Sequence, residues 1–302
     1  MSRLLAMTLG RISPKHRTLE QWIDVYRQII QTRPLDPKTI SNRSNSLRYL
    51  VQAMGSRTIS SIKPHEIAQL TRTIHKEHPS TARRVLIEAR DVMNEALAYG
   101  WISSNPAATI KHDRYRVQRK RLSLADWQKI HAHAEQAMPP WVARMLVLAL
   151  VTGQRRGDLQ KMRFSDVTDG YLYITQQKTG AKLRLPLALR LEVIGTSIGE
   201  AVEACRGYAR GEEYLLRKST GQPLTLASLS ARFEWAREGA LGLYEGDGLP
   251  PSLHECRSLS ERLYRAQGVD TKTLLGHKRQ QMTDVYNDDR GLTAGEWKTL
   301  EI

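Results

Sequence analysis

A break near the middle of this 302-residue chain constrains its fold more than any other feature. Asn105-Pro106 ends a helical pattern, and residues 111–121 then read KHDRYRVQRKR, which is rich in Lys and Arg and lacks apolar periodicity. Because a chain of this length can bury two modest cores, the break indicates two domains joined by a basic linker. The expected boundaries are a short N-terminal extension at 1–17, a helical domain at 18–107, the linker at 108–122, and a second domain at 123–302 with a C-terminal tail from 291.

The spacing of apolar residues predicts that the first domain is helical. Leu19, Trp22 and Tyr26 recur at intervals of three and four residues, which is the pattern of an amphipathic helix. An N-cap residue followed by proline marks the start of a helix, and a glycine commonly marks its end. Three more helices are therefore expected, from Asp36-Pro37 to Gly55, from near Pro64, and from Ser80 to Gly100.

The second domain is expected to mix helices with a small sheet. It begins at Ser123, an N-cap, and the stretch Trp141–Val151 is apolar on nearly every side, which predicts a buried helix. Alternating residues predict strands at 171–174 and 183–187 on either side of a turn at 178–180. Further helices are expected near 188–204, 225–241, 254–267 and 271–286, with a break at Gly276 in the last.

The net charge of +15 points to a polyanionic partner, with nucleic acid first and an anionic membrane surface second. Residues 1–122 hold 22 Lys and Arg against 9 Asp and Glu, whereas residues 123–302 hold 24 against 22. We interpret the basic run as a linker that lies against phosphate, with a solvated tether as the alternative. The candidate DNA contacts are Arg43, Arg83, Arg84, Arg116, Arg119, Lys120 and Arg121.

Composition also argues against several other classes of protein. No uncharged apolar run approaches the roughly 18 residues of a membrane-spanning helix, and the first 16 residues do not resemble a secretory signal. Cys205 and Cys256 form neither a disulfide framework nor a zinc-binding spacing, which favours a reducing cytoplasm. No carboxylate cluster suits Mg²⁺, so we expect neither a metal nor another cofactor.

Four motifs could together cleave a phosphodiester without a metal, since that reaction needs a nucleophile, cations around the phosphate oxygens and an acid for the leaving oxygen. The first motif is Arg155 before a helix, with Asp158 three residues later to hold a guanidinium or cap the turn. The second is Lys178 on the predicted turn. The third is His254 and Arg257 on one helix face, and the fourth is His277, nine residues before Tyr286. Each motif alone is more typical of an ordinary surface or packing residue.

Together, the five matches at Arg155, Lys178, HECR, LGH and Tyr286 resemble the tyrosine recombinase family of the phage integrase type. The stretches TGQRRGDL, DGYLYITQQKTGAKLRLPL, HECRSLSERLY and LLGHKRQQMTDVYNDDRG are similar to lambda-type integrases, and the resemblance covers roughly residues 18–302. Lambda-type integrases carry a further small N-terminal domain that binds arm sites. Only 16 to 18 residues precede the first predicted helix, too few for that domain, and this departure puts arm-site binding and accessory-protein control in question.

The resemblance implies a multi-domain fold of the α and α+β classes. Its parts would be an N-terminal helical, SAM-like core-binding domain and a mixed α/β tyrosine recombinase catalytic domain with a small antiparallel sheet, together forming a C-shaped clamp around DNA. It also implies a homotetramer on double-stranded attachment sites, with DNA-bending accessory proteins as candidate partners, in the cytoplasm and nucleoid of a bacterial host. The activity would be integration or excision of a mobile element.

The resemblance further implies roles for the site residues. Tyr286 would attack the scissile phosphate to give a 3′-phosphotyrosine and a free 5′-hydroxyl. Arg155 and Arg257 would bind the non-bridging oxygens, and Lys178 would be the general acid. His254 and His277 would add hydrogen bonds, and His254 would assist deprotonation of the tyrosine. The alternatives are a type IB topoisomerase with the same catalytic set and a DNA-binding regulator with an inactive site.

Overall fold

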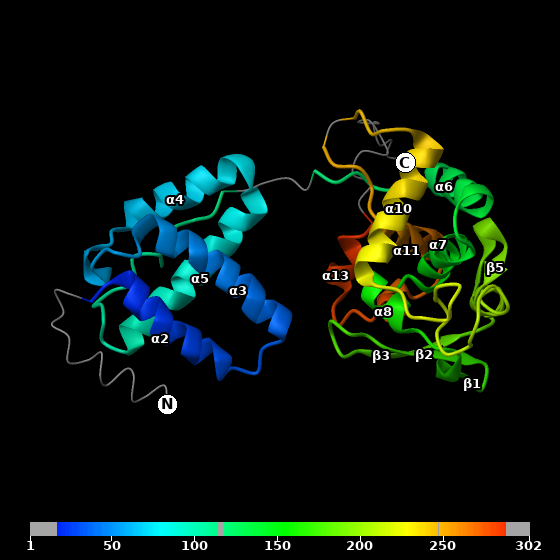
Figure 1. The fold of residues 1–302 in the computed structure, drawn as a ribbon, viewed down its shortest axis with the longest axis horizontal. Coiled ribbons are helices and arrows are strands. Elements are labelled where there is room, and N and C mark those ends of the chain that lie inside the picture. Colours follow the sequence, from blue (N-terminus) through cyan, green and yellow to red (C-terminus); the bar gives the residue numbers. More distant parts are fainter. Residues whose placement is uncertain (1–16, 114–117, 247, 288–302) are drawn as a thin grey trace, which may run out of the picture. The chain divides into compact units, whose positions relative to one another are not determined.

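The computed structural model describes residues 17–113, 118–246 and 248–287 (Figure 1). The chain divides into two compact units, Met1–Val117 and Gln118–Ile302, and this boundary falls inside the predicted linker at 108–122. The predicted extension at 1–17, apart from its last residue, and the tail from 291 lie outside the described residues. No helix in the described ranges is both long enough and apolar enough to cross a membrane.

The described part of the first unit is built from helices α2 (Leu19–Gln31), α3 (Pro37–Met54), α4 (Pro64–Glu77) and α5 (Pro79–Ala98), with the short 3-10 helix η2 (Ile59–Ser61). Thr18 caps α2 in a capping box with Gln21, and the Asp36 side chain caps α3, as its N-cap position predicts. The core contains Trp22, whose indole nitrogen donates to the Val92 carbonyl at 2.9 Å. The four helices predicted from periodicity are thus present.

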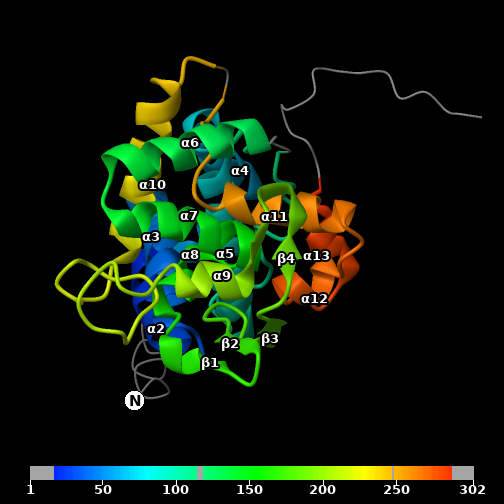
Figure 2. The same ribbon diagram turned by 90° about the vertical axis from the view of Figure 1, so that its right-hand side faces the viewer.

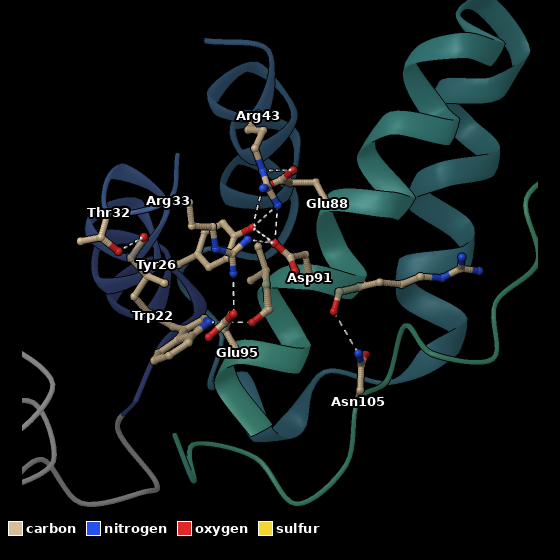
Figure 3. A network of polar contacts seen from close by, with 12 residues as sticks. Trp22, Tyr26, Thr32, Arg33, Arg43, Glu88, Asp91, Glu95 and Asn105 are labelled. Atoms are coloured by element: carbon tan, nitrogen blue, oxygen red, sulfur yellow. Dashed lines mark hydrogen bonds and ion pairs between the residues drawn. The ribbon is translucent and has the colours of Figure 1, made fainter. Parts of the chain in front are cut away.

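An ion-pair network ties α2, α3 and α5 together (Figure 3). The Arg43 guanidinium binds the carboxylates of Glu88 and Asp91, and it also donates to the Tyr26 hydroxyl. Arg33 binds Asp91 as well, at 2.7 Å, and Glu95. Arg43 therefore lies within a packing network rather than on an unpaired helix face, so the prediction that it contacts DNA is wrong.

The second unit is organised around the buried helix α7 (Pro140–Thr152). Helices α6 (Leu124–Ala137), α8 (Arg156–Lys161), α9 (Ile198–Glu203), α10 (Leu226–Leu241) and α11 (Glu255–Ala266) all contact it, as Figures 1 and 2 show. All but three of the thirteen residues of α7 are buried, so the prediction of a buried helix from its apolar sequence is confirmed. Two short helices, α12 (Thr271–Leu275) and α13 (Gln280–Asp284), follow α11.

Small antiparallel sheets lie on the second unit. Strands β1 (Val167–Thr168), β2 (Tyr171–Thr175) and β3 (Lys182–Pro186) form one sheet in that order, with Tyr171 opposite Pro186 and Thr175 opposite Lys182. The β2–β3 turn contains Gly180 at φ +67°, a conformation that favours glycine. Strands β4 (Arg190–Leu191) and β5 (Thr196–Ser197) form a second sheet around the 3-10 turn η4 (Glu192–Ile194). The predicted β2–β3 hairpin is thus observed, whereas β1 and the second sheet were not predicted.

One predicted helix of the second domain is wrong in extent, and another divides at the glycine where a break was predicted. The helix expected near 188–204 is confined to α9, because Gly195 adopts φ +62° and Ser197 starts the helix with a capping box. The helix expected over 271–286 is split into α12 and α13. Gly276 ends α12 at φ +65°, and a Cβ at this position would lie 3.0 Å from the Gln176 side chain. The apolar periodicity of both stretches is real, but backbone turns interrupt it.

Candidate active site

Arg155 lies between two helices at the edge of the core. Helix α7 ends at Gly153 in the left-handed conformation, φ +63°, and Arg155 is then the N-cap of α8, as the sequence predicted. One guanidinium nitrogen of Arg155 donates to Oε1 of Gln176 at 3.1 Å. Among the described residues no carboxylate lies within ion-pair distance of Arg155, so none of them neutralises its positive charge.

The β2–β3 turn carries Lys178 toward the same place. Lys178 is exposed, and its charge is one of those that lower the pKa of His254, which puts the two side chains in one site. Asp158, which is 4% exposed, accepts a hydrogen bond from the backbone nitrogen of Gln177 at 2.8 Å. Asp158 was predicted either to hold a guanidinium or to cap a turn. Its hydrogen bond to Gln177 caps the turn that carries Lys178.

Arg257 is the buried cation of the site. It is 1% exposed on the first turn of α11, and its guanidinium donates to the carbonyls of Gly153 at 2.7 Å and Leu275 at 2.6 Å. Its Nε has no hydrogen-bond partner in the described part of the chain. Burial, followed by the charge of Arg155, lowers the pKa of Arg257 to about 10, so it stays protonated at neutral pH. A buried cation without a carboxylate partner is costly unless an anion is bound beside it.

His277 supports Arg257 from the side. Its Nε2 lies 3.1 Å from a guanidinium nitrogen of Arg257, and its Nδ1 lies 2.9 Å from the Thr283 hydroxyl. Since a guanidinium can only donate, Nε2 is the acceptor and Nδ1 carries the proton. Burial, together with the charges of Arg257 and Arg155, lowers the pKa of His277 to about 4. The ring is therefore neutral and holds Arg257 in place.

Tyr286 packs against His277, Arg257 and His254. Its ring stacks on His277 with centroids 5.5 Å apart, and the Arg257 guanidinium lies 5.6 Å from the ring centroid. Its hydroxyl lies 3.4 Å from Nε2 of His254. Loss of hydration, then the charges of Arg257, Arg155 and Lys178, lower the pKa of His254 to about 4, so this imidazole is neutral and can accept a proton.

The structure thus brings together every residue that the sequence predicted for catalysis. The list is Arg155, Lys178, His254, Arg257, His277 and Tyr286, with Asp158 beneath the hairpin. Within the described residues, no group of three His, Cys, Asp or Glu side chains could hold a metal ion. The positive charge that faces a substrate here comes from two arginines and a lysine.

Sequence reasoning missed three side chains that support the site. Gln154 and Gln176 are 2% and 1% exposed and bind each other at 2.8 Å, between Arg155 and the turn before His277. The Ser258 hydroxyl donates to the Tyr286 carbonyl at 2.8 Å. Neutral side chains give no charge or metal-ligand signal in a sequence, although TGQR and TQQK did place both glutamines beside predicted catalytic residues.

The end of the basic linker is buried against the catalytic unit, which corrects the predicted role of Arg121. Arg121 is 4% exposed, pairs with Glu255 at 3.0 Å and donates to the Val285 carbonyl at 2.5 Å, one residue before Tyr286. Such a side chain is not available to DNA phosphate. Arg119 donates to the Pro250 carbonyl at 2.6 Å, and Arg116 lies outside the described residues. Lys120 is partly exposed and remains a candidate contact.

A cationic pocket lies in the first unit. Its volume is about 420 Å³, and α4, α5 and residues 110–113 line it. The lining includes the cations Arg72, Arg83 and Lys111, one carboxylate, Asp113, and the histidines His65, His75 and His112. Arg83 is one of the predicted DNA contacts, and it is exposed. Arg84, beside it, is also exposed and bonds to the Ser80 carbonyl of its own helix. These side chains are candidates for phosphate contact.

Comparison with known proteins decides the family. Residues 120–291 match the model of the phage integrase family, and residues 17–113 match that of the phage integrase central domain. The chain belongs to the phage integrase family. It is therefore a site-specific tyrosine recombinase that integrates or excises phage DNA.

The relatives cover nearly the whole chain. The integrase of Escherichia phage lambda is 36% identical over 94% of this chain and 79% of its own length, and the prophage integrase IntE of Escherichia coli K12 is 39% identical over 91% and 76%. A solved lambda integrase fragment, a dimer bound to a COC′ core site, matches with a TM-score of 0.87 over 94% of this chain and 99% of its own. A lambda integrase tetramer bound to a Holliday junction matches with a TM-score of 0.88 at 34% identity over 98% and 83%.

Proposed function

We propose that Tyr286 is the nucleophile with which this recombinase cuts and rejoins double-stranded DNA at attachment sites. Its hydroxyl attacks the scissile phosphorus, forms a 3′-phosphotyrosine and releases the 5′ oxygen, which leaves with a proton as a 5′-hydroxyl. Because the phosphotyrosine keeps the energy of the broken bond, the reverse attack by a 5′-hydroxyl reseals DNA without a nucleotide cofactor. The placement of Tyr286 over Arg257, with its hydroxyl 3.4 Å from His254, is the observation that carries this proposal.

The surrounding groups divide the remaining work. Arg155 and Arg257 neutralise the non-bridging oxygens as negative charge develops on them. Neutral His254 takes the proton of the tyrosine hydroxyl. A bound phosphate opposes the cations that lower the pKa of His254, so its pKa rises as substrate enters. Lys178 protonates the leaving 5′ oxygen from the mobile end of an exposed side chain.

Assembly on DNA is part of the same proposal. The lambda integrase relative has been solved as a dimer bound to a core site and as a tetramer bound to a Holliday junction. By analogy, four copies of this chain bring two attachment sites together and exchange strands through such a junction. We also propose that the protein acts at the nucleoid, where its substrate lies.

Covalent capture tests the nucleophile. A pool of nicked duplexes with a randomised segment is incubated with the protein, denatured, and resolved for a protein–DNA adduct; the duplex recovered most often becomes the substrate of later tests. The wild type should yield an adduct whose peptide contains Tyr286. The Tyr286→Phe protein should bind the selected duplex equally well but form no adduct. An adduct that persists in Tyr286→Phe would refute the assignment.

A further inference from the structure

A fully buried amide joins three of the segments that carry the site. Gln176 follows β2 and is 1% exposed. Its Nε2 donates to Oε1 of Gln154 at 2.8 Å and to the Leu275 carbonyl at 3.0 Å. Its Oε1 accepts from Arg155 at 3.1 Å and from the Thr179 hydroxyl at 2.7 Å. These four contacts use both donors and both acceptor positions of the amide.

Gln154 anchors this amide to the core. Its Nε2 donates to the carbonyls of Thr152 and Leu274, each at 2.9 Å. The Leu275 carbonyl, which accepts from Gln176, also accepts from Arg257. The loop of Arg155, the turn of Lys178 and the turn before His277 are therefore linked through one pair of glutamines. A rearrangement of either amide would disturb all three segments at once.

The neutrality of Gln176 matters for the cation that it holds. A carboxylate at this place would form an ion pair with Arg155 and compete with a substrate phosphate for the guanidinium. The neutral amide oxygen accepts a hydrogen bond from Arg155 and leaves the full positive charge of the guanidinium available. Because the amide is buried and fully bonded, its position is fixed, and so is the direction from which Arg155 is held.

We propose that Gln176, anchored by Gln154, is a positioning residue that sets the Arg155 guanidinium for the scissile phosphate. This inference rests on the proposed function, because it requires Arg155 to bind that phosphate. Gln176 itself does not contact the substrate. Its loss should therefore slow DNA cleavage by about 10- to 100-fold, the range expected for a misplaced group, while DNA affinity changes little.

A neutral substrate separates this role from a merely structural one. The selected nicked duplex is made with a phosphate and with a methylphosphonate at the cleavage position, where a methyl group replaces one charged oxygen. A group that acts by placing a cation matters less when the charge is gone. The Gln176→Met protein should therefore show a large defect on phosphate and a much smaller one on methylphosphonate, each measured against wild type on the same substrate. Arg155→Ala should show the same pattern.

Two further variants keep the test decisive. Gln160 on α8 donates an amide hydrogen bond to the Leu224 carbonyl, away from the site, so Gln160→Met should cleave both substrates like wild type. If Gln176→Met does not fold, Gln176→Glu takes its place in the test. The glutamate keeps both acceptor positions and loses both donors, and its charge pairs with Arg155. Gln176→Glu should therefore also show a larger defect on phosphate than on methylphosphonate. Equal defects of the Gln176 variants on the two substrates, or no defect, would refute the inference alone. Absence of any wild-type adduct would refute the proposed function with it.

Discussion

At the scale of single residues, Lys178 differs from the other cations of the site because it is exposed at a turn rather than held by carbonyls. A long, mobile side chain is suited to follow a leaving oxygen and give it a proton. Arg257, in contrast, is fixed by two carbonyl groups and His277 and is suited to bind charge that does not move. This contrast supports the separate roles that we propose for the two cations, phosphate binding for Arg257 and proton donation for Lys178.

Substrates that need no acid test the role of Lys178. A 5′-bridging phosphorothiolate has a sulfur leaving group that departs without a proton. We expect Lys178→Ala to lose about 10²- to 10⁴-fold in the cleavage rate of ordinary DNA and far less with the phosphorothiolate. Lys182→Ala, which removes an exposed lysine from the same hairpin, should affect both substrates alike. Equal losses for Lys178→Ala on both substrates would mean that Lys178 only binds DNA.

The low pKa of His277, about 4, predicts how stability depends on pH. In the unfolded chain an imidazole takes up a proton below about pH 6.5, whereas in the folded protein His277 stays neutral to about pH 4. Between these values the unfolded state binds more protons, so the free energy of unfolding falls as pH falls. His277 should contribute a loss of about 2 kcal/mol between pH 7 and pH 5. Urea titrations should show a smaller loss for His277→Gln, and an unchanged loss would contradict the prediction.

At the scale of elements, periodicity predicted the first unit better than the second. Helices α2 to α5 carry apolar faces, and side chains cap the starts of α2 and α3. Helix α5 begins at Pro79 without a side-chain cap, so the prediction of Ser80 as its N-cap is wrong. The stretch 188–204 has similar apolar content, but the backbone turns at Gly195 and pairs Arg190 with Ser197. Two-residue strands carry too little alternation to be recognised.

The candidate site was predicted more completely than the elements around it. Its charged and aromatic residues stand in short motifs, and four stretches of chain carry them all. The long-range contacts of Gln154, Gln176 and Arg121 could not be predicted, because they join segments 21 or more residues apart. The sequence of a basic linker also does not indicate which of its arginine side chains is buried in the folded protein.

The Arg121 contacts make the last linker residues part of the catalytic unit. Glu255 is 4% exposed, and Arg121→Gln would leave its carboxylate buried without this partner. We expect a loss of about 3–5 kcal/mol in the free energy of unfolding, measured by urea titration. Arg119→Gln, on the same segment, loses the hydrogen bond to the Pro250 carbonyl, the one polar contact of this side chain within the described residues, and should cost about 1 kcal/mol. The double variant Arg121→Gln/Glu255→Gln should recover part of the loss; if it does not, the buried charge is not the cause.

At the scale of the whole molecule, the excess charge is divided unevenly, with +13 of the total +15 before residue 123. Ion pairs already occupy some of its arginines, since the partly buried Arg33 and Arg43 belong to the network of Figure 3. The pocket residues Arg72, Arg83 and Lys111 are exposed and pair with no carboxylate in the described part of the chain. They are therefore better candidates for phosphate contact than the linker arginines whose contacts are described.

The salt dependence of DNA binding tests this assignment. Each phosphate that a protein neutralises adds about 0.9 to the slope of log affinity against log salt. The triple variant Arg72→Gln, Arg83→Gln, Lys111→Gln should lower that slope by up to about 2.7. It should weaken the selected duplex and a random duplex alike, because phosphate contacts position a protein and base contacts specify its site.

A matched variant separates contact from net charge. Arg27, Arg48 and Arg57 also lie in the first unit, but their guanidiniums bind Asp24, Asn45 and Glu66. Replacing these three residues by Gln removes the same amount of positive charge as the pocket variant. A general effect of net charge would therefore lower the slope of log affinity against log salt equally in the two variants. A contact made by the pocket predicts a clearly larger drop for the pocket variant. If the slopes of the two variants are the same, the pocket does not touch DNA, and the phosphate contacts lie elsewhere on the basic unit.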